Sequence, residues 1–106
     1  MILRPITQEL VSSPEIRGSG FLEQLCATTV AMYPPGPVPL PWVGYLAEER
    51  GGVVGTCAYK GPPVAGEVEI AYFTFPEHEG RGFATLMAKS LVEMATENGA
   101  SRVKAQ

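Results

Sequence analysis

One segment of the sequence restricts the possible folds more than any other, because three regular signals follow one another in it. Residues 66–75 are apolar on both faces after their first few positions, which is typical of a central strand. A glycine-containing turn comes next, and apolar residues then recur at helical spacing until Asn98 and Gly99 predict a helix end. Those apolar positions are Ala84, Met87, Ala88, Leu91, Met94 and Ala95.

Strand patterns lie on both sides of this segment. Residues 42–48 and 52–59 have the pattern of two strands, and a glycine turn joins them as a hairpin. Residues 2–7 predict a first strand at a sheet edge. Residues 101–105 begin a last strand, which we expect to run parallel to the central strand after the helical crossover. We therefore predict a single α/β domain with a mixed sheet over residues 1–106.

A helix and a proline-rich loop are predicted between the first strand and the hairpin. The run at residues 12–15 is a helix-start pattern, and Gly18 and Gly20 favour a firm helix that begins near Ser19. Its expected apolar positions are Phe21, Leu22, Leu25, Cys26 and Thr29. Residues 34–41 are mostly proline, which predicts an extended, exposed loop. This loop is either a stiff connector or a ligand for an SH3-type partner.

The composition excludes several classes of partner. The net charge is −3 and the eight Lys and Arg residues are scattered, so we predict no surface for nucleic acid. No apolar stretch approaches the roughly 20 residues of a membrane span, so we expect no membrane partner. Cys26 and Cys57 lack the spacing of metal ligands, so we expect no metal. Two buried, reduced thiols then predict a cytoplasmic protein.

The turn between the central strand and the helix contains the residues best suited to bind an anion. Gly80, Gly82 and Ala84 leave room for a ligand to approach the backbone, and the first N–H groups of a helix have no partners within it. With the helix dipole and the charge of Arg81, this arrangement suits a pyrophosphate. Thr85 stands where the third glycine of a dinucleotide-binding fingerprint would be, so that class of site is disfavoured. Glycines required only for the turn are an equal alternative on these residues alone.

The strand, turn and helix together resemble the Gcn5-related N-acetyltransferase (GNAT) family. Its motif is Gln or Arg, two residues, Gly, one residue, then Gly or Ala, directly after a central strand. Glu79, Gly82 and Ala84 occupy the three motif positions, and Glu79 departs from Gln or Arg. The resemblance covers residues 42–106 well and 2–33 loosely. It implies a GNAT-like fold with acetyl-coenzyme A (acetyl-CoA) as cosubstrate, and an N-acetyltransferase that acts on a primary amine by direct attack.

The resemblance also implies roles for particular residues. Backbone groups of Phe73, Thr74 and Phe75 would pair with the pantetheine arm and thioester, and an N–H near Phe73 would polarise the acetyl carbonyl. The pyrophosphate would be held by Glu79, Gly80, Arg81, Gly82, Phe83, Ala84 and Thr85. Glu69 matches the family's position for a catalytic glutamate and would take the proton of the amine. A solvated carboxylate, like neighbouring Glu67, is the alternative for Glu69, and His78 is expected to be exposed and without a role.

The chain is short for this family, whose members usually continue with a helix and two strands. We therefore expect residues 101–105 to form a strand with one unpaired edge, and either a homodimer through that edge or a loosely ordered C-terminus. Two other functional classes stay open. One is a catalytically inactive coenzyme A-binding or regulatory module, and the other is an interaction module that acts through residues 34–41.

Overall fold

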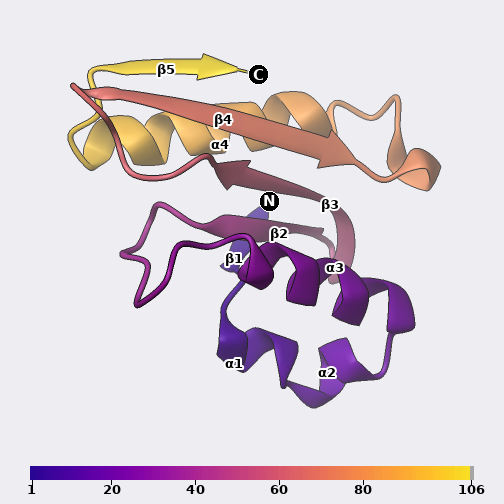
Figure 1. Cartoon of the computed structure of the whole chain (residues 1–106). Coiled ribbons are helices and arrows are strands. Elements are labelled where there is room, and N and C mark those ends of the chain that lie inside the picture. The colour runs from indigo at the N-terminus through magenta and orange to yellow at the C-terminus, as the bar shows by residue number, and fades with distance from the viewer. Residues whose placement is uncertain (106) are drawn as a thin grey trace.

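A five-stranded mixed sheet with helices on both faces is formed by residues 1–105, the part of the chain that the computed structural model describes (Figure 1). The strands are β1 (Ile2–Pro5), β2 (Gly44–Glu49), β3 (Gly52–Tyr59), β4 (Glu67–Thr74) and β5 (Arg102–Ala105). They lie side by side in chain order; β1 to β4 are antiparallel and β5 is parallel to β4. The predicted mixed α/β sheet and the parallel last strand are therefore confirmed.

The helices are α1 (Gln8–Val11), α2 (Pro14–Arg17), α3 (Gly20–Ala31) and α4 (Phe83–Glu97), with a 3₁₀ turn η1 at Pro76–His78. The α4 helix covers one face of the sheet through its buried residues Met87, Leu91 and Ala95, as its periodicity predicts. Asn98 caps its C-terminus, also as predicted. None of the helices in residues 1–105 is both long and apolar enough to cross a membrane.

Helices α1 to α3 form a smaller core on the opposite face. Its buried residues are Ile6, Leu10, Ile16, Cys26 and Leu46. The hydroxyl of Ser19 accepts from the amide of Leu22, which confirms the predicted start of the firm helix. Phe21 was expected to be among the apolar positions of this helix, but 61% of it is exposed. It lies in the first turn of α3, where its ring packs edge-on against the ring of Phe75 and does not enter the core.

The proline-rich segment 34–41 forms neither helix nor strand, which confirms the predicted loop. The chain is anchored where this loop begins and ends. The hydroxyl of Tyr33 donates to the carbonyl of Ile6 at 2.8 Å and accepts from the amide of Gly44 at 2.9 Å. These two bonds connect the end of α3 to both β1 and β2.

Strand β4 was predicted to be buried on both faces after its first few residues, but only its α4 face is buried, and only in the first half of the strand. Val68 and Ile70 are each only 3% exposed, and here β4 lies between β3 and β5. The pairing with β5 ends at Ile70 and Ala105. Beyond that point 41% of Tyr72 and 53% of Phe73 are exposed. The aromatic run alone could not show where the neighbouring strand stops.

Candidate functional site

The turn before α4 keeps the N-terminus of this helix open. Gly80 and Gly82 have φ of +82° and +80°, a left-handed conformation that glycine adopts without strain. Gly82 is the N-cap residue, so no side chain caps the helix, and its first turn contains no acidic residue. The first backbone bond runs from the amide of Leu86 to the carbonyl of Gly82. The amides of Phe83, Ala84 and Thr85 therefore precede the helical hydrogen bonds and can bind an anion.

A cavity of about 330 Å³ lies at this helix end. It is lined by Tyr72, Phe73, Thr74, His78, Glu79, Gly80, Gly82, Phe83 and Ala84. A Cβ atom added at Gly80 or Gly82 would meet no atom within 4 Å, so both glycines border open space. Most of the residues that were predicted to bind the pyrophosphate thus line this cavity. Arg81 and Thr85 are exposed and lie outside its lining.

His78 was expected to be exposed, but its imidazole is half-buried and stands edge-on to the ring of Phe83. Its Nδ1 atom and the Thr74 hydroxyl are buried and have no hydrogen-bond partner within residues 1–105. Both residues line the cavity at the helix end. The burial of His78 could not be predicted from the sequence, because the packing of its ring depends on how the turn folds back over Phe83.

The backbone of β4 alternates between two directions along the open half. The amide of Phe75 donates to Val54 at 2.9 Å and the carbonyl of Glu69 accepts from Lys60 at 2.9 Å, so both residues face β3. Strand alternation gives Phe73 the same direction, whereas the backbone groups of Tyr72 and Thr74 point away from β3. Of the predicted Phe73, Thr74 and Phe75, only Thr74 has its backbone directed to the open side. The backbone of Tyr72 is directed to the same side, and sequence reasoning missed it. Which residues of a strand direct their backbone groups to a given neighbour is known only once the register is known.

Strands β3 and β4 approach each other closely at this place. A Cβ atom added at Gly55 would overlap the carbonyl oxygen of Phe73 and would lie 3.2 Å from the Met87 side chain. Only glycine fits there without a shift of one strand.

Glu69 lies on the α3 side of the sheet, on the same face as Ala71 and Phe73. Those two residues line a groove of about 150 Å³, which Glu69 precedes by two positions without lining it. The Glu69 side chain is half-buried and forms no ion pair with any of residues 1–105. Glu67, by contrast, pairs with Arg102 at 3.7 Å and Lys104 at 3.6 Å. The two carboxylates of this strand are therefore in different electrostatic situations.

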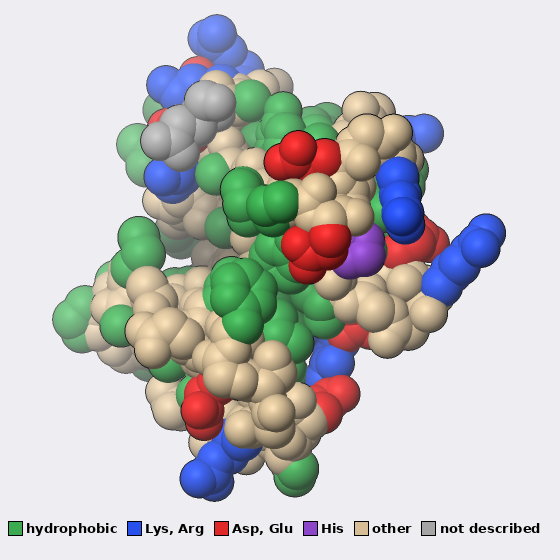
Figure 2. Space-filling model, turned by 90° about the vertical axis from the view of Figure 1, so that its right-hand side faces the viewer, with side chains coloured by type: hydrophobic (Ala, Val, Ile, Leu, Met, Phe, Trp, Pro, Cys, Tyr) green, Lys and Arg blue, Asp and Glu red, His purple; other side chains and the backbone are tan. Residues whose placement is uncertain are grey.

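A second groove, of about 360 Å³, lies on the α3 side at the end of β4. Arg4 donates to Glu48 at 2.8 Å and also to Glu15 within it. These hydrogen bonds raise the pKa of Arg4, and the bond from Arg4 lowers the pKa of Glu15. Figure 2 shows the neighbouring surface, where an apolar band passes between acidic side chains beside the histidine. In residues 1–105 no three His, Cys, Asp or Glu residues are grouped so as to hold a metal ion.

Comparison with known proteins gives one family match. The model described as "Acetyltransferase (GNAT) domain" matches residues 19–106, which is most of the chain. No curated protein sequence matches.

Several solved structures have a similar fold. The ribosomal-protein-alanine N-acetyltransferase from Brucella melitensis biovar Abortus 2308 superposes with a TM-score of 0.63 at 14% identity, over 99% of this chain and 76% of that one. For the GNAT domain of S. lividans PAT the TM-score is 0.60 at 23% identity, over 97% and 69%. An aminoglycoside acetyltransferase from an uncultured soil metagenomic sample gives 0.51 at 20% identity, over 79% and 54%. At these identities the likeness concerns the fold.

Proposed function

The chain belongs to the GNAT acetyltransferase family, and we propose that it transfers an acetyl group from acetyl-coenzyme A to a primary amine by direct attack. The observation that carries the proposal is the open N-terminus of α4. Its first amides have no cap, no acid stands in the first turn, and two left-handed glycines border open space before it. This arrangement fits a pyrophosphate, because anions are stabilised at helix N-termini.

The same proposal gives a role to the open half of β4. An extended arm with amide groups can pair with a strand edge as another strand would. The backbone groups of Tyr72 and Thr74 point to the side where β5 no longer pairs. We assign the pantetheine arm to these groups, with Phe73 and Phe75 providing the adjacent apolar surface. Glu79 to Thr85 then hold the pyrophosphate, with Glu79 close to the ligand and Arg81 contributing its charge from the rim.

The acceptor must be a neutral amine when it attacks. Its nitrogen forms a bond to the thioester carbon, the carbon–sulfur bond breaks, and coenzyme A leaves as a thiolate. An alkyl amine with a pKa near 10.4 is neutral in only about one molecule in 2,500 at pH 7, so a proton acceptor increases the rate. Glu69 is the proposed acceptor of that proton, because its carboxylate is not engaged in an ion pair with residues 1–105 and shares a face with the groove at Ala71.

Ala84 provides the sharpest test of the binding site. It is half-buried, lines the cavity and lies in the first turn of α4. Ala84→Glu places a negative charge where it favours the helix but repels a pyrophosphate, and Ala84→Gln adds similar bulk without charge. We expect titration calorimetry to give an affinity for acetyl-coenzyme A about tenfold weaker for the Glu variant than for the Gln variant. Equal affinities would place the pyrophosphate elsewhere.

A second candidate function is a coenzyme A-binding module without turnover. Glu69 shares a face with the groove that Ala71 and Phe73 line, but it does not line that groove itself. The distance of its carboxylate from the groove favours this second candidate. Acetylation assays on a panel of primary amines separate the candidates, because only the enzyme releases a thiol in an amine-dependent reaction.

Assembly and location are also part of the proposal. In residues 1–105, β5 pairs with β4 alone, which is the expected exposed edge. A homodimer through that edge is our prediction, and sedimentation at micromolar concentration tests it. The two buried free thiols, Cys26 and Cys57, support a cytoplasmic location.

A further inference from the structure

The cavity at the helix end has few side chains that can donate a hydrogen bond to an anion. Within residues 1–105 its lining contains no lysine or arginine, and its one carboxylate, from Glu79, can only accept. The donors among its side chains are the hydroxyls of Tyr72 and Thr74 and the imidazole of His78. Besides the helix amides, these three residues are therefore the available donors for a pyrophosphate in this cavity.

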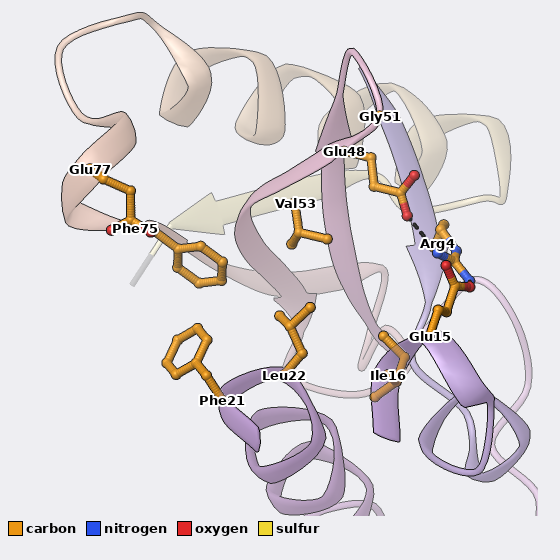
Figure 3. Close-up of a pocket in the computed structure, with 10 residues that line it drawn as sticks. All are labelled: Arg4, Glu15, Ile16, Phe21, Leu22, Glu48, Gly51, Val53, Phe75 and Glu77. Atoms are coloured by element: carbon orange, nitrogen blue, oxygen red, sulfur yellow. Dashed lines mark hydrogen bonds and ion pairs between the residues drawn. The ribbon is translucent and has the colours of Figure 1, made fainter. Parts of the chain in front are cut away.

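Two arginines around the end of β4 are less well placed to reach the cavity. Arg4 lies at the far end of the neighbouring groove, where Figure 3 shows it beside Glu15 and Glu48. It donates to both carboxylates, so its guanidinium is already engaged. Arg81 is exposed and lies outside the cavity lining. Direct contact with an anion inside the cavity is thus left to the side chains that line it.

The imidazole of His78 has one buried and one accessible nitrogen. Nδ1 is buried and has no hydrogen-bond partner within residues 1–105, whereas Nε2 also lacks a partner there but keeps contact with solvent. A neutral imidazole carries one N–H. A buried N–H without an acceptor is costly, so the proton belongs on Nε2. His78 then presents an N–H donor in the lining of the cavity.

A second polar atom at this cavity also lacks a partner. The hydroxyl of Thr74, the last residue of β4, is buried and forms no hydrogen bond within residues 1–105. Buried polar groups in folded proteins are nearly always hydrogen-bonded to protein or to ordered water. Two unsatisfied atoms beside one cavity therefore favour a polar occupant over an apolar one.

We propose that His78 binds the pyrophosphate of coenzyme A, with its Nε2–H donating to a phosphate oxygen. The inference rests on the proposed acetyl transfer and adds a side-chain donor to a site that otherwise offers backbone amides. The ring of His78 stands edge-on to that of Phe83, with 6.3 Å between their centroids, so the donor is held in place before the ligand arrives. Because the phosphate is charged, this hydrogen bond is of the stronger, charge-assisted kind.

NMR of the imidazole tests the contact directly, because His78 is the only histidine in the chain. In protein labelled with nitrogen-15 histidine at pH 8, we expect an N–H on Nε2 and a shift of its signals when coenzyme A is added. 3′-Dephospho-coenzyme A, which keeps the pyrophosphate, should cause a similar shift. Pantetheine, which has no phosphate, should cause none, even at concentrations that shift the amide of Tyr72.

Three outcomes of this titration overturn the inference. They are an equal shift with pantetheine, a shift with coenzyme A but not with its 3′-dephospho form, and no shift although calorimetry shows that coenzyme A binds. If calorimetry shows no binding of coenzyme A, the proposed donor site is rejected as well, which distinguishes the two failures.

Two variants separate the donor from the ring. His78→Phe keeps a ring against Phe83 but removes both nitrogens, so the affinity for coenzyme A should fall about tenfold. His78→Gln loses the ring but offers an amide donor near the position of Nε2, and should bind coenzyme A about threefold more tightly than the Phe variant. Equal affinities of the natural protein and His78→Phe would reject the contact. A parallel loss of pantetheine affinity in His78→Phe would also reject it, since it would assign His78 to the packing of the turn.

Discussion

The two halves of β4 both contain large apolar residues but have opposite surroundings. In the first half, β3 and β5 pair with the strand and its apolar side chains are buried; in the second half, only β3 pairs and Tyr72 and Phe73 are exposed. Backbone pairing, not hydrophobicity, makes this difference. An apolar residue in the first half contributes to stability by burial, whereas one in the second half leaves a surface and a strand edge open to a ligand.

Truncation of a side chain in each half tests this comparison most strongly. Ile70→Ala should lower the free energy of unfolding by about 3 kcal/mol, because it opens a cavity under α4. Phe73→Ala should lower it by less than about 1 kcal/mol, because that ring is half exposed. Urea denaturation of both variants gives the numbers. Similar losses would mean that the second half contributes to stability as much as the first.

Substitution of Glu69, which lies in the first half next to the last residue that pairs with β5, gives the second test. Glu69→Gln should lower the acetylation rate about a hundredfold at pH 7, and by less at higher pH where the amine loses its proton unaided. Glu67→Gln is the matched control, because that carboxylate already pairs with Arg102 and Lys104. A pH–rate profile of each variant is the measurement. An unchanged profile for Glu69→Gln would remove the base from the mechanism.

Hydrogen exchange sharpens the comparison within the second half. The amides of Tyr72 and Thr74 point away from β3, so they should exchange about tenfold faster than that of Phe73. Addition of acetyl-coenzyme A should slow them selectively, since the bound arm would occupy the open edge. Exchange followed by NMR resolves single amides. Uniform rates along residues 72–74 would contradict the alternation inferred from the register.

The smallest expected effect is a loss of stability at high pH that comes from the buried thiol of Cys57 in β3. Burial raises the pKa of the Cys57 thiol from 9.0 to about 12, so the folded protein favours the neutral thiol. This contribution to stability is complete below pH 9 and is lost as pH rises from 9 towards 12. We expect about 1 kcal/mol less stability at pH 10 than at pH 8 from this thiol. In denaturation at both pH values, Cys57→Ala should show a smaller loss, and an equal loss would assign it to other groups.

Much of the fold was visible in the sequence because its signals are local. The spacing of Met87, Leu91 and Ala95 predicts the α4 helix and its buried face, and the hydroxyl of Ser19 marks the start of α3. The hairpin strands β2 and β3 follow from a glycine turn between two apolar runs. The crossover rule then gives the parallel direction of β5.

The features that escaped sequence reasoning depend on register and on long-range contacts. No local pattern states that β5 stops pairing at Ile70, so neither the exposure of Phe73 nor the open backbone of Tyr72 could be predicted. The groove between Phe21 and Arg4 is assembled from segments far apart in the chain. The short helix α1 was missed because its four residues carry no periodicity.

The close approach at Gly55 has a consequence for how this protein can vary. Gly55 lies in β3, and a side chain there would press on the carbonyl of Phe73 and on Met87. Any substitution would therefore displace the strand whose open edge we assign to the substrate. In a mutational scan, or among natural variants, this position should tolerate as little change as a residue that touches the ligand. Constraint on the site should thus extend to Gly55, whose lack of a side chain keeps β3 and β4 close together.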